Sequence, residues 1–390
     1  MKGKRPDTKL VQGGRNREWT QGAVSPPVWR ASTIVFETIA DMHEAYPPEQ
    51  GRLHYGRHGT PTTWGLCDAL TQLEPEGKGT WLYSSGLAAV SGALMSVLRT
   101  GDELLVADNV FGPTRRFCDR HLRRFGVSVS YYDPSEGAAI RRLFTDRTKV
   151  VLLESPGSIT MEVQDVPAIC EVAHAHDIVT VLDNTWATPL LFPALAAGVD
   201  ISVIACTKYI AGHADVMLGS ATANSRLWGP LRDFGMASGQ TASPDDAFLT
   251  ARGLRTLGLR LRRHGESALA VAKWLSEQPQ VSKVLHPALP DCPGNDLWER
   301  DFLGSSGLFS FVLRGGSGKA CAAMVDRLSH FGKGYSWGGF ESLAIPMDVG
   351  KLRTVNRWDP RGPLVRLSIG LEDVDDLIED LAAALASYEM

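Results

Sequence analysis

The sequence predicts an α/β fold built on a mostly parallel sheet of seven strands, with a smaller α+β domain at its C-terminal end. From about residue 80 to residue 225, short apolar runs alternate with amphipathic stretches, as they do in sheets covered on both faces. After about residue 245 this alternation gives way to a long amphipathic segment. At 390 residues the chain also exceeds what one core usually holds, so we expect two domains.

The elements of the main domain follow from runs bounded by turn residues. The apolar runs that predict strands lie at 80–83, 103–107, 128–132, 150–154, 179–183, 201–205 and 218–222. Amphipathic spacing between them predicts helices at 87–99, 113–125, 166–176 and 189–197. Strands that alternate with helices in this way are typical of a parallel sheet.

The two ends of the chain differ from this middle part. Residues 1–60 are rich in proline, glycine and polar residues, which predicts an extended arm that packs onto something else, such as a partner subunit, rather than a domain with its own core. We expect the α/β domain at 61–245 and the α+β domain at 246–390. The segment 245–278 leads into the latter, with strands near 307–313 and 364–369 and helices near 318–330 and 373–388.

Composition argues against several classes of function. A formal net charge of -4 gives no electrostatic case for nucleic acid or an anionic membrane. The arginine pairs at 115–116 and 123–124 flank apolar positions at helical spacing, which indicates a solvated helix face. No apolar stretch reaches the ~18 residues that span a bilayer, and the N-terminal residues do not predict a signal peptide. The six cysteines show no metal-ligand spacing, so we expect free thiols, no metal site and a cytoplasmic protein.

Two charged residues end neighbouring apolar strands and define the chemistry. Asp183 ends the run 179–183, and Lys208 follows the run 201–205. Pyridoxal 5'-phosphate (PLP) needs such a pair, because a lysine amine forms the Schiff base with the cofactor aldehyde. A carboxylate beside the pyridine nitrogen keeps that nitrogen protonated, since an opposite charge favours the charged form. The sequence therefore predicts a PLP enzyme whose cofactor lies in the 61–245 domain.

Further residues are suited to the cofactor phosphate. Ser85, Gly86 and Leu87 follow a strand and open a helix, where backbone N–H groups and the helix dipole bind anions. The hydroxyl of Thr207 offers one more hydrogen bond. In the arm, Tyr55 and Arg57 point the same way in an extended chain and could reach one phosphate, although a surface turn explains them equally well.

Arg366 lies in an apolar strand, where an unpaired charge would be costly. A bidentate clamp on the α-carboxylate of an amino-acid substrate suits a guanidinium group. A structural ion pair with an acidic residue remains the alternative.

These motifs resemble the Cys/Met-metabolism family of PLP-dependent enzymes of fold type I, over nearly the whole chain. Within that family the chain looks most like bacterial cystathionine β-lyases. The segments that carry the resemblance are Glu154-Ser-Pro-Gly-Ser158, Asp183-Asn-Thr-Trp186 and Tyr335-Ser-Trp-Gly-Gly-Phe-Glu-Ser342.

The resemblance implies roles for individual residues. Lys208 binds the cofactor and moves the proton from Cα to the leaving sulfur, and Asp183 pairs with the pyridine nitrogen. Ser336 and Trp337 help Arg366 to bind the substrate carboxylate, and Tyr335 lines the distal part of the pocket. Shared sites, with Tyr55 and Arg57 supplied by the partner, imply a homodimer as the minimal unit and a tetramer as the usual assembly.

One position departs from the family pattern. Phe111 stands where the family has a tyrosine that stacks on the cofactor and helps proton transfer. Phenylalanine keeps the stacking ring and loses the hydroxyl. General acid–base help is worth about 10²–10⁴-fold, so this substitution bears on the activity.

Three functions are consistent with these residues. The first is a carbon–sulfur β-lyase that converts L-cystathionine and water to L-homocysteine, pyruvate and ammonia, as a step of transsulfuration in methionine biosynthesis. The second is a γ-lyase, a γ-replacement enzyme or a specialised β-lyase for another amino acid, which Phe111 favours. The third, a remote one, is a PLP-binding regulatory protein with little turnover.

Overall fold

A computed structural model describes residues 3–46, 50–355, 358 and 361–389 of the chain. Its larger sheet has seven strands in the order β1-β7-β6-β5-β4-β2-β3. Strands β2 (Glu103–Ala107), β3 (Ser128–Tyr132), β4 (Thr148–Glu154) and β5 (Val179–Asp183) pair in parallel. Strand β7 (Gly219–Ala223) runs antiparallel to β1 (Gly79–Tyr83) and to β6 (Ile201–Ile204). The predicted α/β fold with a mostly parallel sheet is therefore confirmed.

The chain divides into two compact units, each formed by two stretches of sequence. The first unit comprises Met1–Val97 and Pro193–Gly258, and the second comprises Leu98–Phe192 and Leu259–Met390. The boundaries that we expected at residues 60 and 245 stay a prediction.

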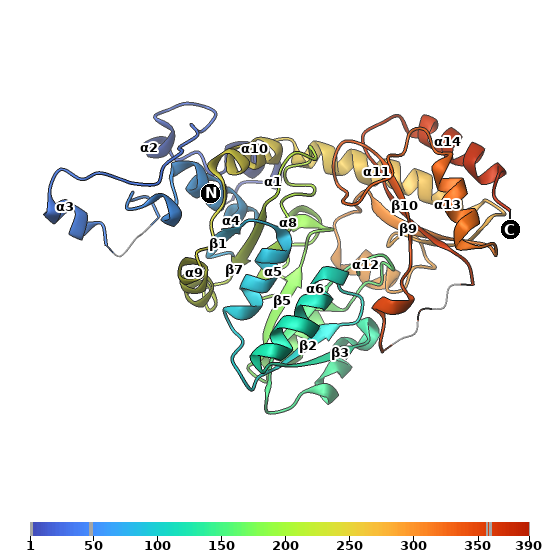
Figure 1. The fold of residues 1–390 in the computed structure, drawn as a ribbon, viewed down its shortest axis with the longest axis horizontal. Helices are drawn as coiled ribbons and strands as arrows, with labels where there is room; N and C mark the ends of the chain where they lie inside the picture. The colour runs from blue at the N-terminus through green and yellow to red at the C-terminus, as the bar shows by residue number, and fades with distance from the viewer. Residues whose placement is uncertain (1–2, 47–49, 356–357, 359–360, 390) are drawn as a thin grey trace. The chain divides into compact units, whose positions relative to one another are not determined.

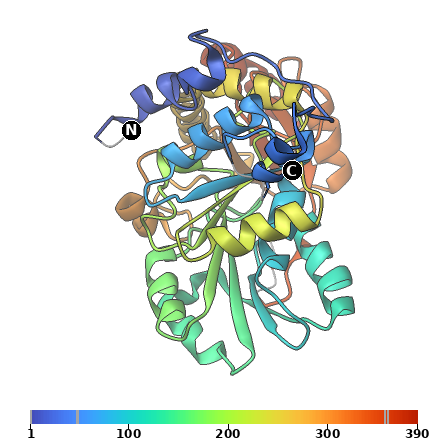
Figure 2. The same ribbon diagram turned by 90° about the vertical axis from the view of Figure 1, so that its left-hand side faces the viewer.

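In the first unit, helices pack on the strands β1, β6 and β7. Helix α4 (Pro61–Leu73) contacts β1, α5 (Gly86–Met95) contacts β6 and β7, and α9 (Trp228–Ala237) packs on β1 and β7. Figure 2 shows α9, in yellow, lying in front of these strands. The predicted arm forms short helices rather than a wholly extended chain: α1 (Pro6–Gln12), α2 (Arg17–Thr20) and α3 (Ile39–Glu44). Helix α10 (Pro244–Leu254) packs on α4.

In the second unit, the parallel strands are apolar along their length because helices cover both faces of such sheets. Every residue of β2 is buried, as are Val179, Thr180, Val181 and Leu182 of β5. Helix α6 (Gly112–Phe117) follows β2, and α7 (Val166–His174) precedes β5. The helix predicted at 189–197 is shorter, since α8 (Thr188–Leu191) ends two residues before Pro193. Proline disfavours helical backbone in the residue before it, and Phe192 is extended there.

The C-terminal part of the second unit is built on a sheet in the order β10-β11-β9-β8. Its strands are β8 (Val281–Leu285), β9 (Leu308–Leu313), β10 (Leu343–Met347) and β11 (Leu364–Ser368). Figure 1 shows α13 (Gly318–Asp326) and α14 (Val374–Ala386) beside this sheet. One core joins the sheet to these helices and to α11 (Leu257–Ser276). The predicted α+β character is present, although β8 and β10 are not recognisable in the sequence.

The remaining elements are short. They are α12 (Asn295–Asp301), the 3₁₀ turns η1 (Gly56–His58), η3 (Arg123–Phe125), η4 (Pro134–Leu143) and η5 (Gly350–Leu352), and the π-helical turn η2 (Cys118–Leu122). In the described ranges, no helix is both long enough and apolar enough to cross a bilayer. The same residues contain no group of three metal-ligating side chains, and all six cysteines are free thiols.

The aromatic core of the C-terminal sheet gives a stability prediction. Phe311 is fully buried in β9, so Phe311→Ala should lower the free energy of unfolding of the second unit by about 3–5 kcal/mol. Urea unfolding followed by tryptophan fluorescence measures this loss. Leu303→Ala, at a side chain that is 74% exposed, is the control and should change stability by less than ~0.5 kcal/mol. Equal losses for the two variants would contradict the assigned core.

Candidate active site

In the first unit, the turn from β1 into α5 has the features of a phosphate site. The Ser85 hydroxyl caps α5 by accepting a hydrogen bond from the Ala88 N–H at 3.2 Å. The turn has no room for a side chain, because a Cβ on Gly86 would lie 2.4 Å from the Ala205 Cβ. The N–H groups of the first helical turn, including those of Gly86 and Leu87, have no acceptor within the helix. These residues fit the phosphate of PLP, which needs close backbone donors and a helix N-terminus.

Lys208 and Thr207 lie beside this turn, directly after β6. Gly86 packs against Ala205, which also accepts a hydrogen bond from the Lys208 N–H at 3.0 Å. The Thr207 hydroxyl accepts from the Leu218 N–H at 3.0 Å, which ties this segment to the start of β7. The structure thus brings the predicted phosphate residues and the segment that carries the lysine together within one unit.

Tyr55 and Arg57 lie at η1, also in the first unit. The Arg57 guanidinium is 5.9 Å from the centre of the Tyr55 ring, and its Nη1 donates to the Met236 carbonyl at 3.0 Å. The two side chains are exposed, with 40% of Tyr55 accessible to solvent. Exposure is consistent both with a contact to another molecule and with a surface turn, so the role of this pair stays a prediction.

In the second unit, Asp183 lies beside a second carboxylate. Asp183 ends β5 and is paired in register with Glu154, which ends β4. The Thr185 hydroxyl and N–H both donate to Asp183 Oδ1, at 2.5 Å and 3.1 Å. Two donors on one oxygen solvate a charged carboxylate, which suits Asp183 to face a protonated pyridine nitrogen.

Phe111 is connected to this pair through its backbone. Its N–H donates to Glu154 Oε2 at 2.7 Å, and 43% of the residue is exposed. Burial raises the pKa of Glu154 well above its ordinary value, and the Asp183 charge raises it further. The Phe111 N–H and the Arg353 charge oppose this shift without cancelling it. Burial and the Asp183 charge therefore both favour the protonated form of Glu154.

Arg366 is buried in β11 and faces the Tyr335-Ser336-Trp337 segment. Its Nη2 donates to the Ser336 carbonyl at 3.0 Å, while Tyr335 is 87% exposed. Burial lowers the pKa of Arg366 to about 10, so the guanidinium stays charged at neutral pH. In the described residues no carboxylate forms an ion pair with it, which favours the substrate clamp over the structural ion pair. Ser336 has a left-handed φ of 83°, a conformation that is costly for a residue other than glycine.

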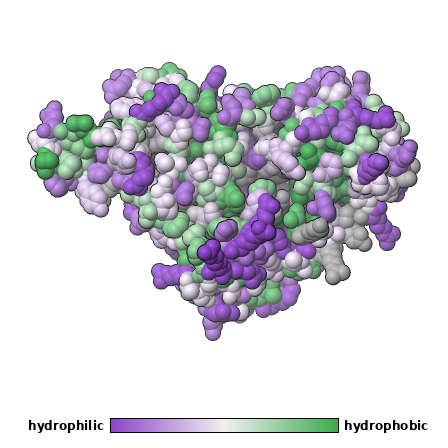
Figure 3. Space-filling view, in the orientation of Figure 1, coloured by the Kyte–Doolittle hydropathy of each residue, from purple (hydrophilic) through white to green (hydrophobic). Residues whose placement is uncertain are grey.

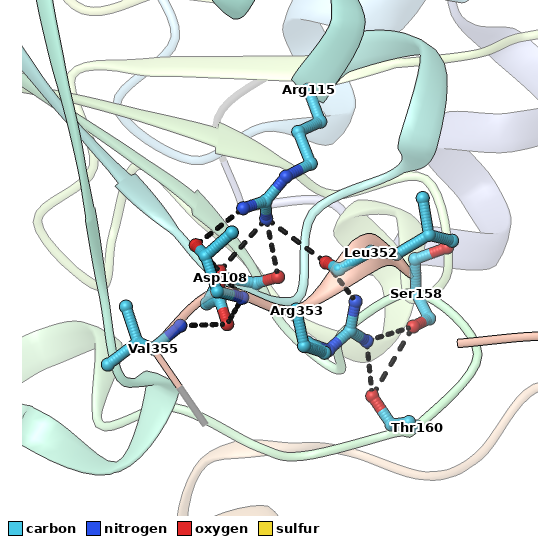
Figure 4. A network of polar contacts seen from close by, with 8 residues as sticks. Asp108, Arg115, Ser158, Thr160, Leu352, Arg353 and Val355 are labelled. Carbon is cyan, nitrogen blue, oxygen red and sulfur yellow. Dashed lines mark hydrogen bonds and ion pairs between the residues drawn. The ribbon is translucent and has the colours of Figure 1, made fainter. Parts of the chain in front are cut away.

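A network that the sequence does not reveal surrounds Asp108, at the carboxyl end of β2 (Figure 4). The fully buried Asp108 carboxylate pairs with Arg115 at 2.9 Å. It also accepts from the N–H groups of Thr354 and Val355, at 2.8 Å and 3.0 Å. Asp108 and Arg115 lie on either side of the loop that contains Phe111 and bind each other. Both also bind Thr354, so this loop is held against residues 354–355.

Arg115 and Arg353 extend this network to two further segments. Arg115 donates to the Leu352 carbonyl at 3.1 Å and stacks over the Tyr131 ring at 3.7 Å. The Nη2 of Arg353 donates to the Ser158 carbonyl and to the Thr160 hydroxyl, at 2.9 Å and 2.6 Å. In Figure 4 the two guanidinium groups lie close together and their donors point to different loops. The network thereby fixes the loops after β2 and β4 to residues 352–355.

One expectation about these arginines was wrong. Arg115 does not belong to a solvated helix face but is buried, because a carboxylate lies within reach on its side of the helix. The expectation holds for Arg116, Arg123 and Arg124, which are exposed. The strongly hydrophilic patch in the lower centre of Figure 3 lies over α6 and the turns that follow it.

Comparisons with known proteins agree with this chemistry. The family model of the Cys/Met metabolism PLP-dependent enzymes matches residues 7–386. The cystathionine beta-lyase MetC of Escherichia coli K12 is 46% identical over 393 residues, covering 99% of each chain. The L-alanine/L-glutamate racemase of Wolbachia pipientis is 40% identical and covers 97% of this chain and 96% of its own. The crystal structure of metB from Corynebacterium glutamicum superimposes with a TM-score of 0.91 at 28% identity, covering 99% of both chains.

The chain therefore belongs to the Cys/Met metabolism family of PLP-dependent enzymes. Its cofactor is PLP, and its fold is that of fold type I.

Sequence reasoning gave no role to Glu154, Asp108, Arg115 or Arg353. Glu154 carried a recognisable signal, since it ends an apolar strand in the same way as Asp183 does. Besides Arg115, Asp108 binds Thr354 and Val355, which lie more than 240 residues away, and no local pattern reports such a contact.

The network around Asp108 gives a prediction about stability. Asp108→Asn leaves Arg115 buried without its counter-charge, so the free energy of unfolding should fall by about 3–5 kcal/mol at pH 7. Asp119→Asn, at the exposed pair with Arg123, is the control and should cost less than ~1 kcal/mol. Urea unfolding measures both values. If Asp108→Asn lowers the free energy of unfolding no more than Asp119→Asn does, Asp108 does not stabilise the fold as the counter-charge of Arg115.

The pH dependence of this loss follows from the pKa of Asp108. Burial alone would raise this pKa, but hydrogen bonds from Val355, Arg115 and Thr354 outweigh burial and lower it. A lowered pKa in the folded state means that the stabilisation is complete above the ordinary value of ~3.9 and is lost as the pH falls. The difference between wild type and Asp108→Asn should therefore shrink below about pH 4.

Proposed function

We propose that this PLP enzyme is a carbon–sulfur β-lyase that cleaves L-cystathionine with water to L-homocysteine, pyruvate and ammonia. The observation that carries the proposal is identity along the whole chain to proteins named cystathionine beta-lyase. They include the Escherichia coli protein, at 46%, and the Salmonella typhimurium protein, at 47% over 99% of this chain. The buried, charged Arg366 beside the Tyr335-Ser336-Trp337 segment supports an amino-acid substrate.

The proposed cofactor residues bind different parts of PLP. Lys208 binds the cofactor, and Asp183 holds a proton on the pyridine nitrogen. The N-terminus of α5, with Ser85, Gly86 and Leu87, binds the phosphate together with Thr207. Bound PLP supplies an electron sink that makes the substrate Cα proton acidic.

The substrate steps are assigned to residues of this chain. Arg366, with Ser336 and Trp337, holds the α-carboxylate. The Lys208 amine removes the Cα proton and then donates a proton to the leaving sulfur. Phe111 packs on the cofactor ring and, lacking a hydroxyl, takes no proton. Tyr335 lines the distal part of the pocket.

We further propose that the protein acts as a homo-oligomer in the cytoplasm. Tyr55 and Arg57 are exposed in the first unit and would complete the site of a partner subunit, so the minimal unit is a dimer and we expect a tetramer. Six free thiols support a reducing compartment.

The second candidate is another reaction of the same family, and Phe111 favours it. This residue lacks the hydroxyl that the family uses at this position. In addition, some relatives with a different activity have a sequence identity to this chain that is not far below that of the lyases. They include the racemase named above and the cystathionine gamma-synthase of Mycobacterium leprae, which is 35% identical over 97% of this chain.

The products formed from L-cystathionine test the proposal. Wild type should form pyruvate and homocysteine in equal amounts, with 2-oxobutyrate close to background. Phe111→Tyr restores the acid–base hydroxyl and should raise kcat by up to about 10²-fold if proton transfer limits the rate. Pyruvate and 2-oxobutyrate are quantified by chromatography of their hydrazones, and homocysteine is quantified through its thiol group. Predominant 2-oxobutyrate, or no pyruvate from either protein at high enzyme concentration, would contradict the proposed β-lyase.

Arg366 provides a test of how the substrate is held. Arg366→Lys keeps the charge but loses the bidentate donors, so KM for L-cystathionine should rise about tenfold or more. Arg314→Lys is the matched control, since Arg314 follows β9 and donates only to backbone carbonyls in the described residues. Steady-state kinetics give both KM values. An unchanged KM for Arg366→Lys would assign the carboxylate to another residue.

A further inference from the structure

Two carboxyl groups stand side by side at the carboxyl ends of β4 and β5, and only one of them has a role in the chemistry so far. Glu154 and Asp183 are in register on adjacent parallel strands, so their side chains leave the same face of the sheet. Two adjacent carboxylates repel each other, and a pair of this kind usually keeps one proton. Glu154 and Asp183 differ in the hydrogen-bond donors that surround each carboxyl group.

The donors assign the charge to Asp183. Its Oδ1 accepts from both the hydroxyl and the N–H of Thr185. Glu154 Oε2 accepts from the Phe111 N–H at 2.7 Å. A neutral carboxyl group can still accept this bond through its carbonyl oxygen, so Glu154 needs no charge to hold Phe111. The raised pKa of Glu154, which follows from burial and the neighbouring Asp183, agrees with that state.

The backbone at Glu154 is itself fixed. The Gln164 side-chain amide donates to the Glu154 carbonyl at 2.8 Å, and its oxygen accepts from the Tyr132 hydroxyl at 2.8 Å. The Ser155 hydroxyl accepts from the Gln164 N–H at 3.0 Å. Gln164 and Tyr132 are buried. Glu154 is therefore anchored, and it can impose a position on the more exposed Phe111.

We propose that Glu154 is a positioning residue of the cofactor site: its uncharged carboxyl group holds the Phe111 backbone, which sets the Phe111 ring against the cofactor and leaves the negative charge on Asp183. This inference rests on the proposed roles of Phe111 and Asp183. It explains how a phenylalanine, with no hydroxyl to anchor its ring, keeps a defined place in the site. The hydrogen bond that holds this residue is donated by its backbone N–H.

Three variants separate a hydrogen-bond role from a charge role. Glu154→Gln keeps the carbonyl acceptor without any charge, Glu154→Leu removes the acceptor, and Glu154→Asp withdraws the acid by one methylene group. Glu103→Gln is the matched control, because Glu103 is a buried glutamate at the opposite end of β2 and is bound by Ser130, Thr145 and Thr148. Each protein is purified as holoenzyme, stripped of PLP and titrated with PLP.

The readouts are the Kd for PLP, from tryptophan fluorescence, and the circular dichroism of the bound cofactor in its visible band, which reports the orientation of the ring. Glu154→Gln should bind PLP within about twofold of wild type and give the same visible spectrum. Glu154→Leu and Glu154→Asp should weaken binding by about three- to tenfold, the range for one lost hydrogen bond, and change the visible spectrum. Glu103→Gln should change thermal stability without changing either readout.

Two results would overturn the proposal. If Glu154→Gln weakens PLP binding as much as Glu154→Leu does, Glu154 acts through a negative charge. If Glu154→Leu, or Glu154→Asp where the leucine variant does not fold, leaves both readouts unchanged, Glu154 does not position the ring. Neither readout depends on turnover, so a wild type that binds PLP but forms no pyruvate would refute the proposed lyase activity and leave this test intact.

Discussion

Parallel pairing of β2, β4 and β5 is the constraint on which the chemistry of the second unit depends. Strands that run in the same direction present their carboxyl ends at one edge, and this chain ends them with Ala107 followed by Asp108, with Glu154 and with Asp183. In the observed register Glu154 lies directly opposite Asp183, and Leu152 of β4 lies opposite Val106 of β2. Once the register is fixed, the three acidic groups must share that edge.

The protein accommodates these charges by giving each acid different partners. Asp108 is neutralised by Arg115 and by backbone donors, Asp183 is solvated by Thr185, and burial raises the pKa of Glu154, which favours its protonated form. As a result, each carboxyl group can do something different: join loops, carry a charge, or hold a backbone N–H. The same chemical group serves three purposes because the local donors, and not the residue type, decide its state.

The extent to which the sequence predicts this arrangement depends on how local each signal is. The strands β1 to β7 are predicted within one or two residues, because buried parallel strands are short apolar runs. Lys208 and Asp183 are recognisable because a charged residue after an apolar run is conspicuous. The strands β8 and β10 are missed: β8 is only five residues long and has the two polar residues Ser282 and Lys283 in its middle, and β10 contains Pro346. The buried state of Arg115 cannot be predicted, since it depends on partners at 108 and 352–354 that only the fold brings near.

The chemistry proposed for this protein requires that PLP is bound to Lys208. Reduction of the purified holoenzyme with borohydride fixes the cofactor to the lysine that binds it, and peptide mass spectrometry locates the label. We expect one labelled peptide, with the pyridoxyl group on Lys208 in the segment after β6. A label on a different lysine, or a holoenzyme that yields no labelled peptide, would show that Lys208 does not carry the cofactor.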